Sequence, residues 1–371
     1  MKQVLITGGA GFIGSHLADE LLAHGYRVRV LDCLDPQVHG DSRRRPDYLD
    51  PEVELQVGDV TDKDALLKAL RGVDAVYHFA AAVGVGQSMY EVAHYTRVNN
   101  LGTAVLLEAL IAQPVQRLVI ASSMSLYGEG LYRNAAGETR VAGERSVEQL
   151  RSGSWELHDE NGAVLTPVPT PETKPPALAS VYALSKFDQE RMSLMIGRAY
   201  QIPTVALRFF NAYGPRQALS NPYTGVLAIF ASRLLNNSAP KLFEDGLQQR
   251  DFVSVYDLVR ACRLALEAPE AAGEVFNIGS GQPLTVRDVA ARLARVLGKE
   301  EIAPEIVGKY RVGDIRHCFA DIGKARAVLG YSPRVTLDEG MGELAAWLES
   351  QAAVDRVAQA SAELASRGLT I

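Results

Sequence analysis

The chain has little cysteine, no long apolar run and no excess of basic residues. Its three cysteines, Cys33, Cys262 and Cys318, are scattered along 371 residues without a CxxC pair. This spacing argues against a disulfide framework or a structural zinc site, and it favours a reducing cytoplasm. No stretch approaches the roughly 18 consecutive apolar residues of a membrane span, and the first residues lack a secretory-signal pattern. We therefore expect a cytoplasmic protein without a membrane partner.

The net charge and the length of the chain narrow the class of protein further. With 38 Lys and Arg against 44 Asp and Glu, the formal net charge is −6, which argues against nucleic acid as a partner. At roughly 150 residues per domain, the length predicts about two domains.

Strand-like and helix-like segments alternate over the first half of the chain. This alternation predicts an α/β fold: a Rossmann-type doubly wound parallel sheet with a smaller, mixed α/β C-terminal lobe. The apolar runs expected to form strands are residues 3–6, 27–31, 53–57, 75–79, 117–121, 204–207 and 274–278. The expected helices cover residues 14–24, 62–70, 102–111, 182–200 and 286–296.

A stretch rich in proline and glycine, residues 128–181, interrupts this alternation and predicts an irregular excursion. We expect residues 1–210 to form the dinucleotide-binding domain, with an insert at 129–180 and with strand segments of 250–278 returning to it. The substrate lobe would then comprise 211–249 and 279–348, and the Ala-rich residues 349–371 would form a helical tail.

The first strong motif follows the first expected strand and opens the first expected helix. It reads Thr7-Gly8-Gly9-Ala10-Gly11-Phe12-Ile13-Gly14. Glycines at positions 8, 11 and 14 permit a tight turn and a close approach of the backbone to a pyrophosphate, while the helix N-terminus offers free N–H groups. The motif predicts a dinucleotide site.

Two aspartates follow the next strands. Asp32 closes the second strand, where a carboxylate can bind the ribose hydroxyls of a dinucleotide and would repel a 2′-phosphate. Asp32 therefore favours NAD over NADP, and the alternative is that it caps a turn. Asp59 follows the third strand, and two roles stay open for it: an adenine contact or helix capping.

The second strong motif is Tyr182-Ala183-Leu184-Ser185-Lys186. Residues four apart share one face of a helix, so a phenol would lie beside an ammonium group. A nearby Lys⁺, together with a cationic nicotinamide, would lower the tyrosine pKa and provide a base near neutral pH. Ser123, at the end of the fifth strand, would point into the crevice where open α/β sheets bind ligands. Without the cofactor motif, Tyr-x-x-x-Lys would be read as a solvated helix face.

Several motifs together resemble the nucleotide-sugar epimerase/dehydratase group of the extended short-chain dehydrogenase/reductases. Besides the glycine motif and Tyr182–Lys186, they are His78-Phe79-Ala80-Ala81, Val98-Asn99-Asn100-Leu101-Gly102-Thr103, Ser122-Ser123, Arg208-Phe209-Phe210-Asn211-Ala212-Tyr213-Gly214-Pro215-Arg216, Arg250-Asp251-Phe252-Val253 and Arg311-Val312-Gly313-Asp314. The resemblance extends over nearly the whole chain.

The resemblance implies NAD as cofactor, a nucleotide-diphosphate sugar as substrate and a homodimer. The implied catalytic residues are Ser123, Tyr182 and Lys186. The residues expected at the cofactor are Gly8, Gly11, Phe12, Ile13, Gly14, Asp32, Asp59, Val60, Phe79, Ala80, Ala81, Asn99, Tyr182 and Lys186, with Asn99 structural. Those expected at the substrate are Ser123, Asn211, Arg216, Arg250 and Arg311; taken singly, such arginines are usually surface ion pairs.

The residues after Ser123 indicate the reaction. In this family, 4,6-dehydratases carry Asp-Glu directly after the catalytic Ser or Thr, and decarboxylases carry a Glu two positions after it. Here Met124 and Ser125 follow. The resemblance therefore implies the minimal machinery of a 4-epimerase, which oxidises C4, lets the 4-keto sugar rotate and reduces it on the other face.

Within the family, three stretches most resemble bacterial dTDP-L-rhamnose 4-epimerases: the insert, the Thr166-Pro167-Val168-Pro169-Thr170 run and residues 217–225. This resemblance implies conversion of dTDP-L-rhamnose to dTDP-6-deoxy-L-talose. The alternatives are a UDP-glucose or UDP-glucuronate 4-epimerase, a nucleotide-sugar reductase or dehydrogenase, and a non-catalytic cofactor sensor. The insert has no cysteine, and its His158-Asp159-Glu160 run is interpreted as loop polarity, so no metal is expected.

Overall fold

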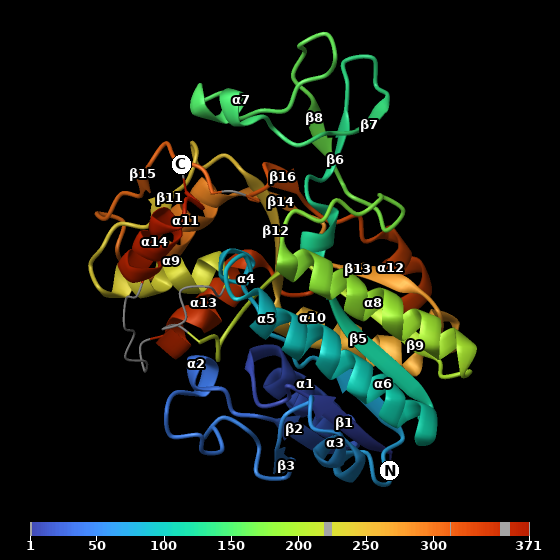
Figure 1. Cartoon of the computed structure of the whole chain (residues 1–371). Coiled ribbons are helices and arrows are strands. Elements are labelled where there is room, and N and C mark those ends of the chain that lie inside the picture. Colours follow the sequence, from blue (N-terminus) through green and yellow to red (C-terminus); the bar gives the residue numbers. More distant parts are fainter. Residues whose placement is uncertain (1, 219–224, 312, 349–356, 371) are drawn as a thin grey trace.

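A seven-stranded parallel sheet forms the centre of the molecule (Figure 1). The computed structural model describes residues 2–218, 225–311, 313–348 and 357–370. Along the sheet the strands follow the order β13-β9-β5-β4-β1-β2-β3. Their bounds are β1 (Gln3–Thr7), β2 (Arg27–Asp32), β3 (Glu54–Val57), β4 (Ala75–His78), β5 (Arg117–Ser123), β9 (Thr204–Phe209) and β13 (Val275–Ile278). The strand order reverses between β1 and β4, where open α/β sheets bind ligands.

Helices cover both faces of this sheet, which confirms the predicted Rossmann-type fold. Because side chains alternate along a strand, Val4 and Ile6 of β1 join the core cluster on one face, whereas Leu5 joins the cluster on the other. The first face is covered by α1 (Phe12–Ala23), α10 (Val255–Glu267) and α12 (Gly323–Leu329). The second is covered by α3 (Lys63–Ala69), α6 (Gly102–Ala112) and α8 (Val181–Ala199).

A smaller lobe packs around a second sheet of mixed direction. Its strands are β10 (Asn211–Tyr213), β12 (Gln249–Ser254), β14 (Pro283–Thr285) and β16 (His317–Cys318), and β11 (Lys241–Leu242) pairs separately with β15 (Glu305–Ile306). The helices α9 (Val226–Leu235), α11 (Val286–Val296) and α13 (Leu337–Leu348) bury their apolar faces in one cluster with this sheet.

The segment 250–278 divides between the two sheets. As expected, β13 lies at an edge of the seven-stranded sheet beside β9. In contrast, β12 does not return to that sheet, since it pairs with β10, β14 and β16 of the smaller lobe.

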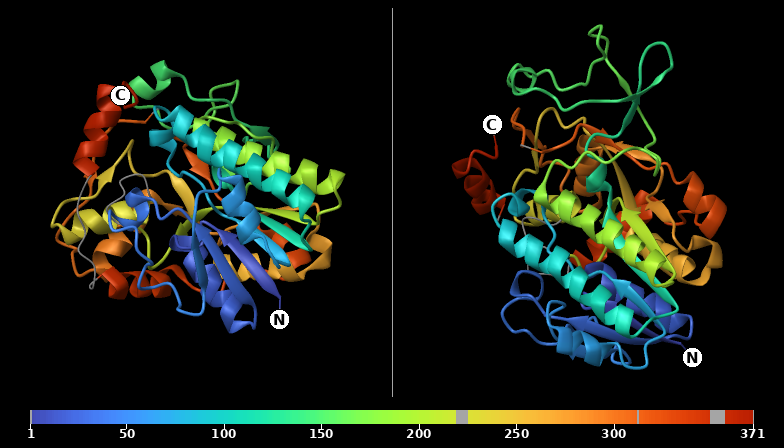
Figure 2. Two further views of the ribbon diagram at one scale, coloured as in Figure 1. Left: turned by 60° about the horizontal axis from the view of Figure 1, so that its bottom comes forward. Right: turned by 45° about the vertical axis from the view of Figure 1, so that its right-hand side comes forward.

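The insert extends from the body of the molecule as a separate layer (Figures 1 and 2). It is more regular than the proline and glycine content predicts, because β6 (Leu131–Arg133) pairs with β7 (Thr139–Val141) and β8 (Thr166–Val168). A short helix, α7 (Val147–Arg151), follows β7, and Tyr132, Leu157 and Leu165 form a small apolar cluster of their own.

Short helical elements complete the chain. They are α2 (Pro36–His39), α4 (Val85–Ser88), α5 (Val92–Tyr95), a π-helix (Thr96–Leu101), two 3₁₀ turns (Met124–Tyr127 and Pro269–Ala271) and α14 (Val357–Ser366) in the tail. None of the helices in the described ranges is long and apolar enough to cross a membrane.

Candidate active site

The glycine loop between β1 and α1 packs closely against itself and against the loop after β4 because side chains are missing from it. Gly8 has φ +70°, and a Cβ atom there would lie 2.7 Å from the backbone nitrogen of Ala80. A Cβ on Gly14 would lie 2.5 Å from the carbonyl oxygen of Gly8. Gly11 is the N-cap of α1, and no side chain caps this helix end. Helix α1 thus begins at Phe12 and Ile13 with free backbone N–H groups. Such a helix N-terminus beside a glycine loop fits the pyrophosphate of NAD.

Asp32 lies at the carboxyl end of β2, beside this loop. Its Oδ2 accepts the N–H of Ala10 at 3.0 Å, and its Oδ1 accepts the N–H of Leu34 at 2.9 Å. These two bonds fix the carboxylate, and each oxygen keeps a further lone pair for a ribose hydroxyl. The position of Asp32 fits the predicted preference for NAD.

Asp59 and Val60 have local structural partners. Asp59 Oδ1 accepts the N–H and the hydroxyl of Thr61, both at 2.8 Å, and so closes the turn before α3. The cap of α3 is Asp62, which accepts the N–H groups of Asp64 and Ala65. Val60 is buried against Gly102.

Residues after β4 form the next part of the site. Phe79 packs edge-on against Phe209, and the N–H of Ala80 donates to Thr7 Oγ1 at 3.3 Å; Ala81 follows directly. The buried Asn99, in the π-helix, holds this segment in place: its amide exchanges two hydrogen bonds with the backbone of Ala82 and donates to Ser185 Oγ at 2.8 Å. Asn99 thus ties the loop after β4 to helix α8.

Ser123, Tyr182 and Lys186 come together where β5 ends and α8 begins. The hydroxyl of Tyr182 forms a hydrogen bond with the Ser123 side chain. Ser125 Oγ donates to Ser123 Oγ at 2.9 Å, and the N–H of Tyr182 donates to Ser88 Oγ at 3.0 Å. Ser123 and Tyr182 are thus direct neighbours, and Lys186 lies one turn further along α8.

The pKa of Tyr182 differs from the sequence-based expectation. Burial raises it, and only the hydrogen bond from Ser123 opposes this rise. Burial also lowers the pKa of Lys186 to about 7, and its ammonium donates to Gln189 Oε1 at 2.7 Å. A lysine with this pKa is charged in only about half of the molecules at neutral pH, which weakens its effect on the phenol.

A buried chain of hydrogen bonds leads from Lys186 back to β1. Gln189 Nε2 donates to Thr103 Oγ1, which lies 2.8 Å from His78 Nε2, and His78 Nδ1 lies 2.8 Å from Thr7 Oγ1. Since Thr103 donates its own proton to a backbone carbonyl, His78 must donate from Nε2 and accept at Nδ1. Burial lowers the His78 pKa to about 3, so the ring is neutral. Sequence reasoning missed Gln189, although it shares a helix face with Lys186.

A cleft with a volume of about 330 Å³ lies between the two lobes and is lined by Met124, Ser125 and Ser180, the chain neighbours of Ser123 and Tyr182. Its lining residues come from the loop after β4, the starts of α8 and α9, the smaller lobe and the tail. They include Val85, Gly86, Met89, Met124, Ser125, Ser180, Asn211, Phe243, Gln248, Arg250, Arg311, Asp314, Leu364 and Leu369.

Arg250 and Arg311, which the resemblance assigns to the substrate, both line this cleft. Arg250 donates to the carbonyl oxygens of Ile315 at 2.6 Å and Arg316 at 2.9 Å. Arg311 pairs with Asp314 at 2.9 Å and stacks over Phe243, with 4.6 Å between the guanidinium carbon and the ring centroid.

Two buried side-chain oxygens at the cleft have no hydrogen-bond partner within the described ranges: Asn211 Oδ1 and Gln248 Oε1. Buried polar atoms without partners are costly, so both indicate places where a polar ligand would bind.

Arg216 lies elsewhere. It pairs with Asp19 of α1 at 2.7 Å and lies over the ring of Tyr48, whose hydroxyl donates to the carbonyl of Ala10 in the glycine loop. Arg216 has φ +68°, and its side chain is not among the residues that line the cleft with Arg250. Arg216 therefore lies beside α1 and the glycine loop, and its expected role at the substrate stays a prediction.

The C-terminal tail also reaches the cleft, which no sequence signal indicated. Leu364 is buried and contacts Gly86, Arg367 lies over the ring of Tyr90, and Thr370 forms a β-bridge with Arg311. Leu364 and Leu369 thereby form part of the cleft wall. No group of three or more His, Cys, Asp or Glu side chains in the described ranges is arranged to hold a metal ion.

The doubly wound sheet, the glycine loop with Asp32 and the Ser–Tyr–Lys set define a dinucleotide-dependent enzyme of the short-chain dehydrogenase/reductase type. Residues 4–279 match the NAD dependent epimerase/dehydratase family. The chain therefore belongs to this family: it is an NAD-dependent nucleotide-sugar epimerase of the extended short-chain type.

Relatives and solved structures agree with this assignment. A dTDP-L-rhamnose 4-epimerase of Burkholderia thailandensis is 37% identical over 355 residues, covering 94% of this chain and 96% of the relative. The UDP-glucose 4-epimerase of Thermotoga maritima, solved with UDP-glucose, is similar in structure (TM-score 0.76, 31% identity, 94% of this chain and 98% of that one). The UDP-glucose 4-epimerase of Thermus thermophilus, solved with NAD, has a TM-score of 0.73 at 31% identity, with 94% and 100% covered.

Proposed function

We propose that this protein inverts C4 of a nucleotide-diphosphate sugar, and that the sugar nucleotide is dTDP-L-rhamnose, with dTDP-6-deoxy-L-talose as product. The observation that carries the C4 reaction is the meeting of Ser123, Tyr182 and Lys186 beside a cleft that holds Arg250 and Arg311. Met124 and Ser125 occupy the positions where dehydratases and decarboxylases of the family carry carboxylates.

In this proposal Tyr182 accepts the proton of the sugar 4-hydroxyl as hydride leaves C4. It returns that proton to the 4-oxygen when hydride is added to the opposite face of C4. Ser123 donates a hydrogen bond to the same oxygen as it becomes a carbonyl. NAD, when bound, supplies the hydride acceptor and donor, and its cationic ring adds the positive charge that lowers the tyrosine pKa. Lys186 contributes in its charged form, and it donates to the phenol or to a ribose hydroxyl.

The arginines explain why C4 can be inverted without release of the sugar. Arg250 and Arg311 would hold the diphosphate through charge-assisted hydrogen bonds while the 4-keto sugar turns. Asn211, with its unpartnered Oδ1, would accept from the substrate. We propose that 1–210 binds NAD, and that 211–249 and 279–348 bind the nucleotide sugar.

The choice of dTDP-L-rhamnose is supported by the 37% identity to the Burkholderia enzyme over nearly the full chain. The alternative is a UDP-glucose or UDP-glucuronate 4-epimerase. The similarity to the Thermotoga structure supports UDP-glucose as the substrate in that alternative. A reductase that uses NADPH is disfavoured, because Asp32 would repel a 2′-phosphate.

The test is to incubate the purified enzyme with dTDP-, UDP- and GDP-sugars and to follow the C4 proton by NMR. We expect dTDP-L-rhamnose to equilibrate with its C4 epimer without added NADH. Inversion of UDP-sugars alone would favour the UDP-glucose or UDP-glucuronate 4-epimerase. A net change in the redox state of NAD would refute epimerisation.

We also propose a homodimer formed through α6 and α8, which lie side by side on one surface (Figure 2). This surface exposes large apolar side chains: Leu101 (49% exposed), Leu184 (45%) and Met195 (55%). Burial of such residues between two copies would be favourable. Light scattering after size-exclusion chromatography measures the mass, and a monomer would refute the dimer.

A further inference from the structure

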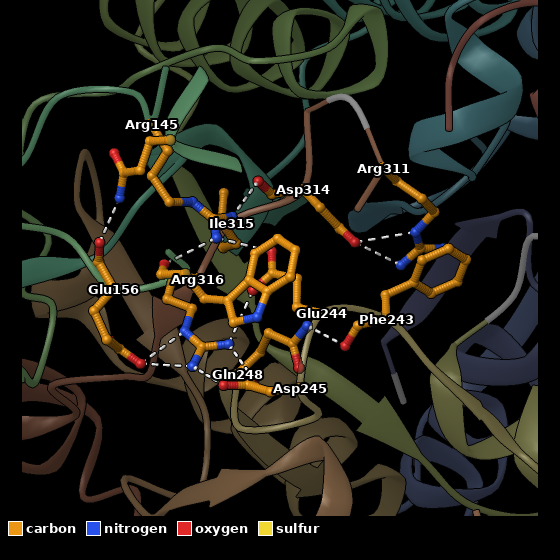
Figure 3. A network of polar contacts seen from close by, with 12 residues as sticks. Arg145, Glu156, Phe243, Glu244, Asp245, Gln248, Arg311, Asp314, Ile315 and Arg316 are labelled. Carbon is orange, nitrogen blue, oxygen red and sulfur yellow. Dashed lines mark hydrogen bonds and ion pairs between the residues drawn. The ribbon is translucent and has the colours of Figure 1, made fainter. Parts of the chain in front are cut away.

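An extensive network of ion pairs joins the insert to the smaller lobe just behind the substrate cleft (Figure 3). The insert contributes Glu129, Arg145 and Glu156; the loop after β11 contributes Glu244 and Asp245; and the segment that leads into β16 contributes Asp314, Arg316 and, as the first residue of β16, His317.

Arg316 is the centre of this network and has no solvent exposure. Its guanidinium lies 2.5 Å from Glu156 Oε1 of the insert. On its other side it binds both oxygens of Asp245, at 2.6 Å and 2.9 Å, and Glu244 Oε2 at 2.9 Å. A buried guanidinium is tolerated only when its donors are paired, so Glu156 completes the shell that fixes Arg316.

The insert also holds the backbone around Arg316. Glu129 accepts the N–H of Arg316 at 2.7 Å and the N–H of His317 at 3.2 Å. Arg145, which is 3% exposed, pairs with Glu244 at 2.8 Å and donates to the carbonyl of Asp314 at 3.3 Å.

The segment held by the insert is the one that holds the cleft arginines. Arg250 donates to the carbonyls of Ile315 and Arg316, so those two peptide groups set the position of its guanidinium. His317 adds a third link, because its Nδ1 accepts the N–H of Gln249 while its Nε2 donates to Glu156 Oε2 at 3.0 Å.

Arg311 is held in the same way. Its carboxylate partner is Asp314, whose carbonyl binds Arg145, and the Phe243 ring under Arg311 directly precedes Glu244. Figure 3 shows these contacts continuing from Arg145 and Glu156 to Arg311. Both cleft arginines therefore depend on segments that the insert anchors.

We infer that the insert, residues 129–180, positions Arg250 and Arg311 for the substrate diphosphate, and that Glu156 and Arg145 are its positioning residues. This inference rests on the proposed function, because it assigns the anionic ligand to those arginines. Neither positioning residue touches the substrate; each acts through the 311–317 segment. The insert is thus a substrate-affinity element that lies outside both lobes.

The test compares Glu156→Gln with Glu138→Gln. Both variants remove one carboxylate from the same insert, but the Glu138 carboxylate is exposed, and its partners Arg140 and Asn134 belong to the insert itself. For Glu156→Gln we expect the KM for the nucleotide sugar to rise about tenfold, equivalent to about 1.4 kcal/mol of binding, with kcat within about twofold. Glu138→Gln should keep both values.

Further measurements separate positioning from folding. Bound NAD and the melting temperature are recorded for each variant, and Glu156→Asp, which keeps the charge, should restore part of the lost affinity. A lower melting temperature with unchanged KM would show a structural role only and would overturn the inference. A fall in kcat with unchanged KM would overturn it as well.

The affinity for UDP and dTDP, measured by calorimetry, separates this inference from the proposed function. If the wild type binds a nucleotide diphosphate and Glu156→Gln binds it equally well, the positioning role fails and the proposed function stands. If the wild type binds neither diphosphate, the proposed function and the inference fail together.

Discussion

The backbone contact at Gly8 allows a quantitative test of the glycine loop. Gly8 and Gly25 both have positive φ, +70° and +78°, but a Cβ atom on Gly25 would meet no atom within 4 Å. On Gly8 it would lie 2.7 Å from Ala80 N and 2.8 Å from Ala80 Cα, both backbone atoms that follow β4. Gly25→Ala is therefore a matched control that contains the dihedral strain without the collision.

The magnitudes follow from these two contributions. A left-handed non-glycine residue costs about 1–2 kcal/mol, so Gly25→Ala should lower the free energy of unfolding by that amount. Overpacking against a fixed neighbour adds about 1–3 kcal/mol, so Gly8→Ala should cost about 2–5 kcal/mol in total. The collision would also displace the loop and weaken NAD binding, whereas Gly25→Ala should bind NAD normally.

Urea unfolding followed by tryptophan fluorescence gives the free energies, and fluorescence titration with NADH gives the affinities. The reasoning is refuted if Gly8→Ala and Gly25→Ala destabilise the protein equally, or if Gly8→Ala retains the wild-type affinity for the dinucleotide.

Three further predictions concern turnover and the cleft. Tyr182→Phe should lower kcat by about 10²–10⁴-fold while NAD remains bound, because the phenol is the proposed proton acceptor; near-normal turnover would contradict this role. Arg250→Ala should raise the KM for the nucleotide sugar by about 10–100-fold, because it removes charged hydrogen bonds worth about 1.5–3 kcal/mol. An unchanged KM would show that Arg250 does not anchor the diphosphate. Leu364→Asp should weaken substrate binding, because it places a charge on the cleft wall. Ala365→Asp, at an exposed position of the same helix, should leave substrate binding unchanged. Equal KM values for the two variants would exclude a role of the tail in binding.

The central fold could be predicted, and a catalytic set could be proposed, because their sequence signals are local. Most strands of the large sheet are short segments rich in apolar residues, and the glycine motif and the Tyr182–Lys186 pair lie within a few residues of sequence. Burial patterns confirm the alternation, as at β1, where neighbouring residues enter different core clusters.

The remaining features depend on partners that are distant in the sequence. Nothing in the sequence of β12 shows that it pairs with β10 and β14, and the left-handed backbone of Arg216 that directs it to α1 has no local pattern. The hydrogen bond from Lys186 to Gln189 and the burial that sets both pKa values likewise arise only from packing. The contacts of Leu364 with Gly86 join residues 278 positions apart, since 364 − 86 = 278.

The division of the chain between two sheets has a consequence for folding and for protein engineering. The chain moves from β9 of the large sheet to β10 of the small one, returns from β12 to β13, and leaves again to β14. A fragment that ends at residue 210 would lack β13, α10 and α12, and it would expose the apolar residues of β9 and α1 that these elements cover. We therefore expect such a fragment to aggregate when expressed alone, and the intact chain to lose both lobes in one cooperative transition. Exchange of the smaller lobe between relatives would require at least two separate segments to be replaced together.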